Sequence, residues 1–217
     1  MSIIIPGRYE LVNRKYTVIS KDILEPDVSK DLNDLIKYHI LDISGNMIEE
    51  IQINSITCFF SHITELYFIN NELKEIPVEI NNLTSLKKLY LSKNKLIKIS
   101  NLDKLKDLEV LDLRANRIKE IDCESLNQNL NLNYLTLSNN QIESISNLPL
   151  LVKLHSFFLF SNQISDFNQF VKDLVSKTPN LSKLLIEGNP MLSGSSDYKT
   201  ILKSNLKQLV TLDFNHC

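Results

Sequence analysis

The stretch LKKLYLSKNKL at residues 86–96 contains the pattern that predicts the fold of this chain. It follows the frame L-x-x-L-x-L-x-x-N-x-L, in which x is any residue. Leu89 and Leu91 are two positions apart, so in a strand, where side chains alternate with a period of two, they point to the same face. Asn94 follows at the point where the chain would leave that strand. The stretch therefore predicts a short strand with one apolar face, ended by a polar turn.

The same frame recurs along most of the sequence. Its asparagine position is filled by Asn46, Asn71, Asn94, Asn116, Asn140, Asn162 and Asn189, and by Cys217 in a last partial frame. The spacings are 25, 23, 22, 24, 22, 27 and 28 residues, close to the period of leucine-rich repeats. One such coil cannot bury its leucines alone, so neighbouring coils stack into a continuous core. We therefore predict an α/β fold: a right-handed solenoid of about eight coils with a concave parallel β-sheet and helical caps.

From about residue 35 onward the chain resembles the leucine-rich repeat superfamily. Residues 86–107 resemble its 22-residue class, typified by the protein phosphatase 1 regulatory subunit, and residues 63–85 resemble its 23-residue class. Residues 189–214 resemble the C-terminal cap of the spliceosomal A-prime protein, the acidic leucine-rich nuclear phosphoproteins and the outer-arm dynein light chain. The matching positions are Asn189, Pro190, Tyr198, Leu209, Leu212 and Asp213. This resemblance implies an intracellular protein, although residues 191–197 form a longer insert and an acidic tail is missing.

The two ends of the chain are predicted to cover the ends of the core. We expect a single domain with an N-terminal cap over residues 1–37, repeats over 38–190 and a C-terminal cap over 191–217. The first cap would hold a hairpin over 9–19 and a helix over 27–39, whose apolar face is Val28, Leu32, Leu35 and Ile36. A last helix, capped by Ser195, Ser196 or Asp197, would pack Tyr198, Ile201, Leu202, Leu206 and Leu209 on the final coil.

Composition excludes several classes of function. The formal net charge is -2, from 24 basic and 26 acidic residues, so the chain as a whole is not attracted to nucleic acid or membranes. Three widely spaced cysteines suit neither a disulfide framework nor a zinc site and favour a reducing compartment. No targeting segment or membrane-spanning run is expected. We therefore expect a cytoplasmic or nuclear location.

The residues that carry chemistry are dispersed. The four histidines, at positions 39, 62, 155 and 216, lack a metal-like arrangement with cysteine or aspartate. His216 and Cys217 are adjacent, but adjacent strand residues face opposite ways and the pair has no third orienting group. We predict no enzyme activity, no metal and no cofactor.

The outward-facing strand positions define a candidate binding surface. We predict partner-binding residues at Tyr67, Ile69, Tyr90, Arg114, Tyr134, Phe158, Phe160 and Leu185. They form two apolar patches separated by a charged stretch, and aromatic residues with arginine are typical of interface hot spots. In the run Phe157 to Phe160, the frame places Phe157 and Leu159 in the core and the other two phenylalanines outside. The alternative is that cross-strand aromatic pairs only stabilise the sheet.

Function is therefore expected on a surface. The main hypothesis is an intracellular adaptor or scaffold that binds another protein through its concave face and is a monomer when unbound. Two alternatives stay open: a protein subunit of a ribonucleoprotein complex, and a regulatory subunit of a phosphatase. Direct nucleic-acid binding is not expected, because no RNA-reading motif is present.

Overall fold

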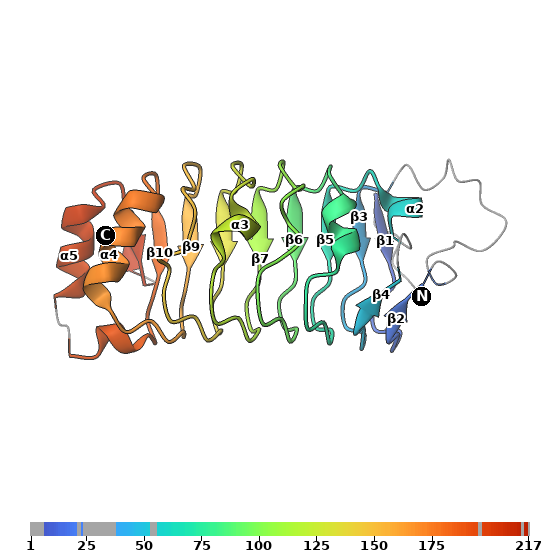
Figure 1. The fold of residues 1–217 in the computed structure, drawn as a ribbon, viewed down its shortest axis with the longest axis horizontal. Helices are drawn as coiled ribbons and strands as arrows, with labels where there is room; N and C mark the ends of the chain where they lie inside the picture. The colour runs from blue at the N-terminus through green and yellow to red at the C-terminus, as the bar shows by residue number, and fades with distance from the viewer. Residues whose placement is uncertain are drawn as a thin grey trace.

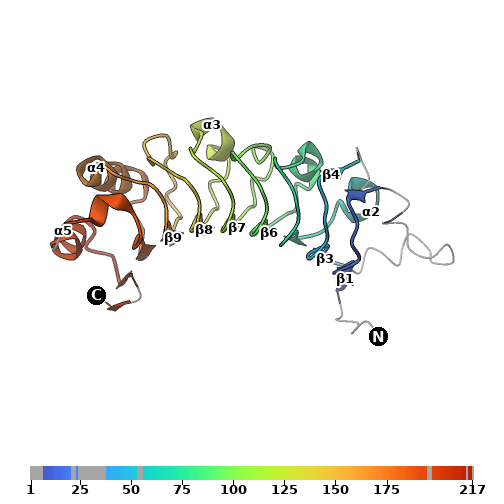
Figure 2. The same ribbon diagram turned by 90° about the horizontal axis from the view of Figure 1, so that it is seen from below.

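A computed structural model describes residues 7–20, 23, 38–52, 56–194, 197–213 and 215–216. The chain winds into an elongated solenoid in which successive coils lie side by side from the N-terminal to the C-terminal end (Figure 1). Seen along its edge, the solenoid is an arch with the strands on its inner side and α3 and α4 on its outer side (Figure 2). The predicted leucine-rich repeat fold with a concave parallel sheet is confirmed.

The sheet contains one short strand from each coil. Its strands are β1 (Arg8–Glu10), β3 (Ile40–Asp42), β5 (Glu65–Tyr67), β6 (Lys88–Tyr90), β7 (Val110–Asp112), β8 (Tyr134–Thr136), β9 (Ser156–Phe158), β10 (Lys183–Leu185), β11 (Thr211–Leu212) and β12 (Asn215–His216). They pair in that order, in parallel from β1 to β11, and β12 pairs antiparallel with β11. The strands are neighbours because each coil brings the chain back to the sheet one strand spacing further along the solenoid.

The register keeps equivalent frame positions opposite each other. Leu89 of β6 pairs with Leu66 of β5 on one side and Leu111 of β7 on the other. All three side chains are completely buried. The frame leucines thus form continuous rows that run through the core from coil to coil.

The frame asparagines form the buried row that the sequence predicts, since all seven are at most 8% exposed. Asn116 shows the arrangement. Its Nδ2 donates to the carbonyl oxygens of Leu91 and Leu113, each at 3.0 Å, and its Oδ1 accepts from the backbone N–H of Leu96 at 3.0 Å. One amide side chain therefore satisfies three buried backbone groups and ties two coils together.

The residue before each frame asparagine adopts a left-handed backbone conformation. These residues are Gly45, Asn70, Lys93, Ala115, Asn139, Ser161 and Gly188, with φ between 52° and 77°. This conformation is unfavourable for residues other than glycine, so the asparagine bonds and strand pairing must hold it in place.

Short helices and a second small sheet line the other sides of the coils. They are α2 (Thr57–Phe60), η2 (Val78–Asn82), α3 (Cys123–Leu126), α4 (Phe167–Lys177), η3 (Pro190–Leu192) and α5 (Tyr198–Asn205), with β2 (Val18–Ile19) pairing in parallel with β4 (Glu50–Ile51). The helix α4 was not predicted individually. It lies in the interval of 27 residues between two frame asparagines, and it begins after Asp166, which accepts from the backbone N–H of Gln169 at 2.9 Å.

The predicted hairpin over residues 9–19 is wrong. Instead, β1 pairs in parallel with β3 and β2 pairs in parallel with β4, so this segment forms a further coil before the first predicted one. The position equivalent to the frame asparagine is Arg14, whose backbone N–H donates to Oδ1 of Asn46 at 2.8 Å. The predicted helix over 27–39 falls almost wholly outside the described residues.

The helix predicted to cover the last coil is α5. Leu202, Leu206 and Leu209 are buried against the core as expected, whereas Ile201 is 39% exposed, which corrects its predicted burial. The Tyr198 hydroxyl donates to Oδ2 of Asp213 at 3.0 Å, and Oδ1 of Asp213 accepts from the backbone N–H of Ile186 at 2.6 Å. Asp213 thus satisfies backbone groups of the last coil much as the asparagines do elsewhere.

Candidate interaction surface on the concave face

The run Phe157 to Phe160 divides between the two sides of the sheet, as predicted. Phe157 and Leu159 are completely buried, and Phe158 and Phe160 are half-buried on the concave side. Strand pairing explains the division, because successive side chains of a strand point to opposite faces. The concave face therefore carries aromatic side chains that the core does not hold.

An N-terminal aromatic cluster consists of Arg8, Tyr67 and Tyr90. The two tyrosine rings stack with centroids 4.4 Å apart and an angle of 15° between their planes. The Arg8 guanidinium carbon lies 4.9 Å from the centroid of the Tyr67 ring. Because Arg8 comes from β1 and Tyr90 from β6, the Tyr67 ring lies between them. A guanidinium over an aromatic ring is stabilising, by about 0.5–1 kcal/mol at exposed sites.

Charged groups fix the N-terminal aromatic cluster in place. The Tyr67 hydroxyl donates to Oε2 of Glu65 at 3.0 Å, and Nζ of Lys88 donates to Oε1 of the same carboxylate at 2.9 Å. Arg8 forms an ion pair with Asp42. Burial, followed by the hydrogen bond to Glu65, raises the pKa of the Tyr67 phenol well above its usual value. This cluster is therefore rigid and internally paired.

A C-terminal aromatic cluster consists of Tyr134, Phe158, Phe160 and Leu185. The rings of Tyr134 and Phe158 meet edge to face, with centroids 5.2 Å apart and an angle of 90°. Phe158 and Leu185 are direct register partners in β9 and β10. Burial is also the main reason that the pKa of the Tyr134 phenol is raised. Tyr134, Phe158 and Leu185 are neighbours on adjacent strands, Phe160 follows Phe158 by two residues, and all four side chains are partly exposed.

An ion pair lies between the two clusters. Nε and Nη2 of Arg114 donate to Oδ1 and Oδ2 of Asp112 at 3.0 and 2.7 Å. Asp112 is 2% exposed, whereas the Arg114 side chain is 52% exposed. The hydrogen bond to Asp112 raises the pKa of the Arg114 guanidinium, so the group is a fixed cation at the surface.

The structure thus brings the predicted residues together in two groups and adds one. Ile69 follows Tyr67 by two residues and is half-buried on the concave side. Its backbone N–H donates to Oγ of Ser44 at 3.1 Å. Sequence reasoning missed Arg8, because its strand was not recognised as part of a coil. The parallel register of Arg8 with Ile40 is the feature that places it on this face.

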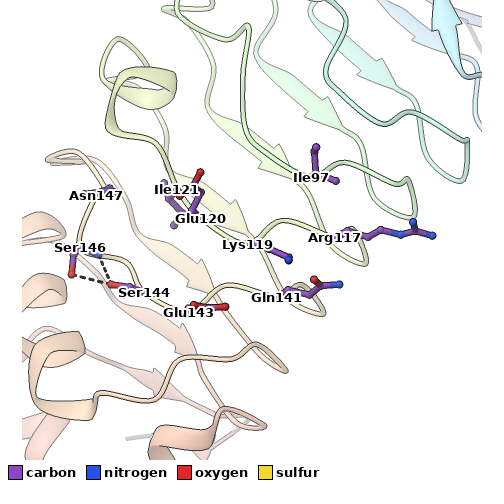
Figure 3. Close-up of a pocket in the computed structure, with 10 residues that line it drawn as sticks. All are labelled: Ile97, Arg117, Lys119, Glu120, Ile121, Gln141, Glu143, Ser144, Ser146 and Asn147. Carbon is purple, nitrogen blue, oxygen red and sulfur yellow. Dashed lines mark hydrogen bonds between the residues drawn. The ribbon is translucent and has the colours of Figure 1, made fainter.

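Other surfaces of the described chain are less suited to binding. An open depression of about 730 Å³ lies in segments that follow three frame asparagines, Asn94, Asn116 and Asn140 (Figure 3). Exposed side chains of both signs line it, including Arg117, Lys119, Glu120 and Glu143. The two serines drawn there, Ser144 and Ser146, hydrogen-bond to each other at 2.9 Å. Its mixed charge and openness indicate no defined ligand.

The described ranges contain neither a membrane-crossing helix nor a cluster of metal ligands. No helix there combines the length and apolar character needed to cross a membrane. The described histidines, cysteines and acidic residues do not gather in groups of three that could hold a metal ion.

The repeated frame, the asparagine row and the concave sheet together define a leucine-rich repeat fold. The family described as Leucine Rich repeats (2 copies) matches residues 84–128. Leucine-rich repeat domains are generally protein-binding modules and are typically non-catalytic. The chain has no match among curated proteins.

Three solved structures from Listeria monocytogenes and Leptospira interrogans are similar to this chain. An internalin C2 (inlC2) of Listeria monocytogenes is 26% identical, with a TM-score of 0.70, and the match covers 95% of this chain and 79% of that one. An internalin (inlF) of the same organism is 24% identical, with a TM-score of 0.66 and coverage of 88% and 52%. The Leptospira interrogans protein LIC12759 is 21% identical, with a TM-score of 0.65 and coverage of 95% and 54%. The chain therefore spans about half the length of the last two.

Proposed function

We propose that this chain is an adaptor or scaffold that binds a partner protein through its concave face. The observation that carries the proposal is the C-terminal aromatic cluster, whose side chains remain partly exposed although the core is filled. Full burial of one phenylalanine would contribute roughly 1.5–3 kcal/mol, of which the isolated solenoid realises only a part because Phe158 and Phe160 are half-buried. A partner that covers this cluster would gain the remaining free energy of burial.

The composition of the surface also supports a protein partner. It combines tyrosine, phenylalanine and a fixed arginine, the residue types that dominate binding energy at protein interfaces. The described contacts do not favour a ribonucleoprotein or phosphatase subunit over a general adaptor. A cytoplasmic or nuclear location, and a monomer in the absence of the partner, are parts of the same proposal.

A comparison of two double variants tests this proposal. Phe158→Ala combined with Phe160→Ala removes the exposed aromatic rings, whereas Val78→Ala combined with Ile97→Ala removes exposed apolar groups from elsewhere, since these residues are 57% and 58% exposed. Affinity capture with mass spectrometry should lose specific partners for the first pair and keep them for the second. Equal capture by wild type and by the phenylalanine variant would contradict binding through this face.

A further inference from the structure

We propose that the concave face takes an extended acidic segment of its partner, with two aromatic side chains four residues apart and an aspartate or glutamate midway between them. The segment would cross the strands from Tyr90 on β6 to Phe158 on β9 and place its carboxylate at Arg114. This inference rests on the proposed function and specifies its ligand.

The spacing of the two anchors favours an extended chain. Register pairing places Tyr90, Asp112, Thr136 and Phe158 in one row, one residue on each of four neighbouring strands. Three strand spacings are about 14 Å. Four residues of an extended chain span about 13–14 Å, and the side chains at i, i+2 and i+4 point to the same side.

A helical ligand fits this row less well. Residues seven apart on a helix share a face but lie only about 10.5 Å apart, and residues eleven apart lie about 16.5 Å apart. Residues nine apart have the right separation, about 13.5 Å, but face opposite ways. An extended segment is therefore the simplest chain that meets both anchors at once.

The two side chains between the anchors in this row are short, so the segment would lie across them. Tyr67 is enclosed between Arg8 and Tyr90, so Tyr90 is the ring of that cluster that borders β7. The next two residues in the row, Asp112 and Thr136, are short and buried, at 2% and 0% exposure. In this row, no long side chain separates Tyr90 from Phe158.

Arg114 gives the middle of this surface a cation. Its bonds to Asp112 use Nε and Nη2, two of the nitrogens that carry the five N–H donors of a guanidinium. The remaining donors can bind a second carboxylate, and a midway residue of the segment would lie about 7 Å from Tyr90, between β7 and β8. An acidic residue at i+2 is therefore the complementary choice.

The surrounding charge favours an acidic ligand. Residues 86–117 contain nine lysines and arginines against four acidic residues, in a chain whose formal net charge is -2. Among the described residues, Lys93 and Arg117 are exposed and form no ion pair within 4.0 Å. Lys93 is beside Arg114, since its backbone N–H donates to the Arg114 carbonyl at 2.8 Å, and positive charge at this position attracts acidic segments and repels basic ones.

Labelled peptides of matched composition test the spacing. We expect the peptide Ser-Phe-Thr-Asp-Thr-Phe-Ser to bind the full chain at least tenfold more tightly than Ser-Phe-Thr-Asp-Phe-Thr-Ser, in which the aromatic residues are three apart. Fluorescence anisotropy measures both dissociation constants. Equal binding of the two peptides, or no binding of the first at 1 mM, would overturn the proposal.

A double-mutant cycle tests the carboxylate. Replacing the peptide aspartate with asparagine should weaken binding about tenfold to wild type but less than threefold to the Arg114→Gln variant. Lys203→Gln removes one exposed positive charge from α5 and should leave the tenfold ratio intact. A tenfold ratio that persists in Arg114→Gln, in a variant shown by circular dichroism to be folded, would place the carboxylate elsewhere.

The two proposals fail in distinguishable ways. If partner capture depends on Phe158 and Phe160 but the two peptides bind equally, the concave face binds a partner of another shape and only the ligand inference is wrong. If partner capture is unaffected by these phenylalanines, the proposed function is wrong as well.

Discussion

On the core side of the sheet, the middle strand residue is nearly the same in every coil from β3 to β10. It is Leu41, Leu66, Leu89, Leu111, Leu135, Phe157 and Leu184, each completely buried. On the concave side, the next residue of the same strands is Asp42, Tyr67, Tyr90, Asp112, Thr136, Phe158 and Leu185. The core side must repeat because its residues pack into one continuous core, whereas the concave side chains meet only neighbours on the same face of the sheet, as Tyr67 meets Tyr90. We therefore expect stability to be concentrated on the core face, and we propose that recognition takes place on the concave face.

The sharpest contrast between these faces is within one strand, and the largest expected effect is on its core side. Phe157→Ala removes a completely buried ring and should lower the free energy of unfolding by about 3–5 kcal/mol. Urea unfolding followed by circular dichroism measures the change. A loss below 1 kcal/mol would mean that Phe157 does not belong to the core.

The asparagine row should be almost as sensitive. Asn116→Ala would leave two buried carbonyls and one buried N–H without the amide partner they have now. We expect a loss of about 3 kcal/mol, since each unsatisfied buried group costs about 1–3 kcal/mol and some will find water. Asn133→Ala is the matched control, because that exposed amide has only a 3.4 Å bond to the Lys153 carbonyl. Equal effects of the two changes would remove the structural role of the row.

On the concave face, the N-terminal aromatic cluster should contribute moderately to stability. Arg8→Ala removes the cation over Tyr67 and the ion pair of Asp42, which is 5% exposed. The expected loss is about 2 kcal/mol, because a buried carboxylate loses its cation. Thermal unfolding of Arg8→Ala and of Arg8→Lys should show a smaller loss for lysine. No loss in either variant would mean that this cluster is as dispensable for folding as an ordinary surface.

The smallest predicted effect has the opposite sign. Thr136 is completely buried and its hydroxyl oxygen has no hydrogen-bond partner in the structure. Thr136→Val keeps the shape and removes an unsatisfied polar group, so the free energy of unfolding should rise by about 1 kcal/mol. A fall of similar size in urea unfolding would show that the hydroxyl is satisfied after all.

The core side was predictable from sequence because every coil must bury its apolar side chains against its neighbours in the same way. The frame around Asn94 places strand, turn and asparagine, and its repetition fixes which side of each strand is buried. The first coil was not predicted, because Tyr9 occupies the position of the middle leucine and Arg14 occupies the position of the frame asparagine. Arg14 also lies 32 residues before Asn46, a longer interval than between the later frame positions. A single coil without its asparagine carries no periodic signal.

Two other features, the contact of Arg8 with Tyr67 and the helix α4, were also not predicted. The contact of Arg8 with Tyr67 joins side chains from strands two apart in the sheet, which no local pattern encodes. The helix α4 did have a signal, since Phe167, Phe170, Val171 and Leu174 recur at helical spacing within the long interval before Asn189. The sequence therefore predicts which residues lie on the concave face better than it predicts which of them are in contact.

The most direct test of the division between the faces is the variant Phe158→Ala combined with Phe160→Ala, measured for stability and binding in one preparation. We predict that the free energy of unfolding falls by about 2 kcal/mol or less, since both rings are half-buried, and that partner binding weakens by about 2 kcal/mol or more. Unfolding as severe as that expected of Phe157→Ala, or unchanged partner binding in a stable variant, would contradict the account.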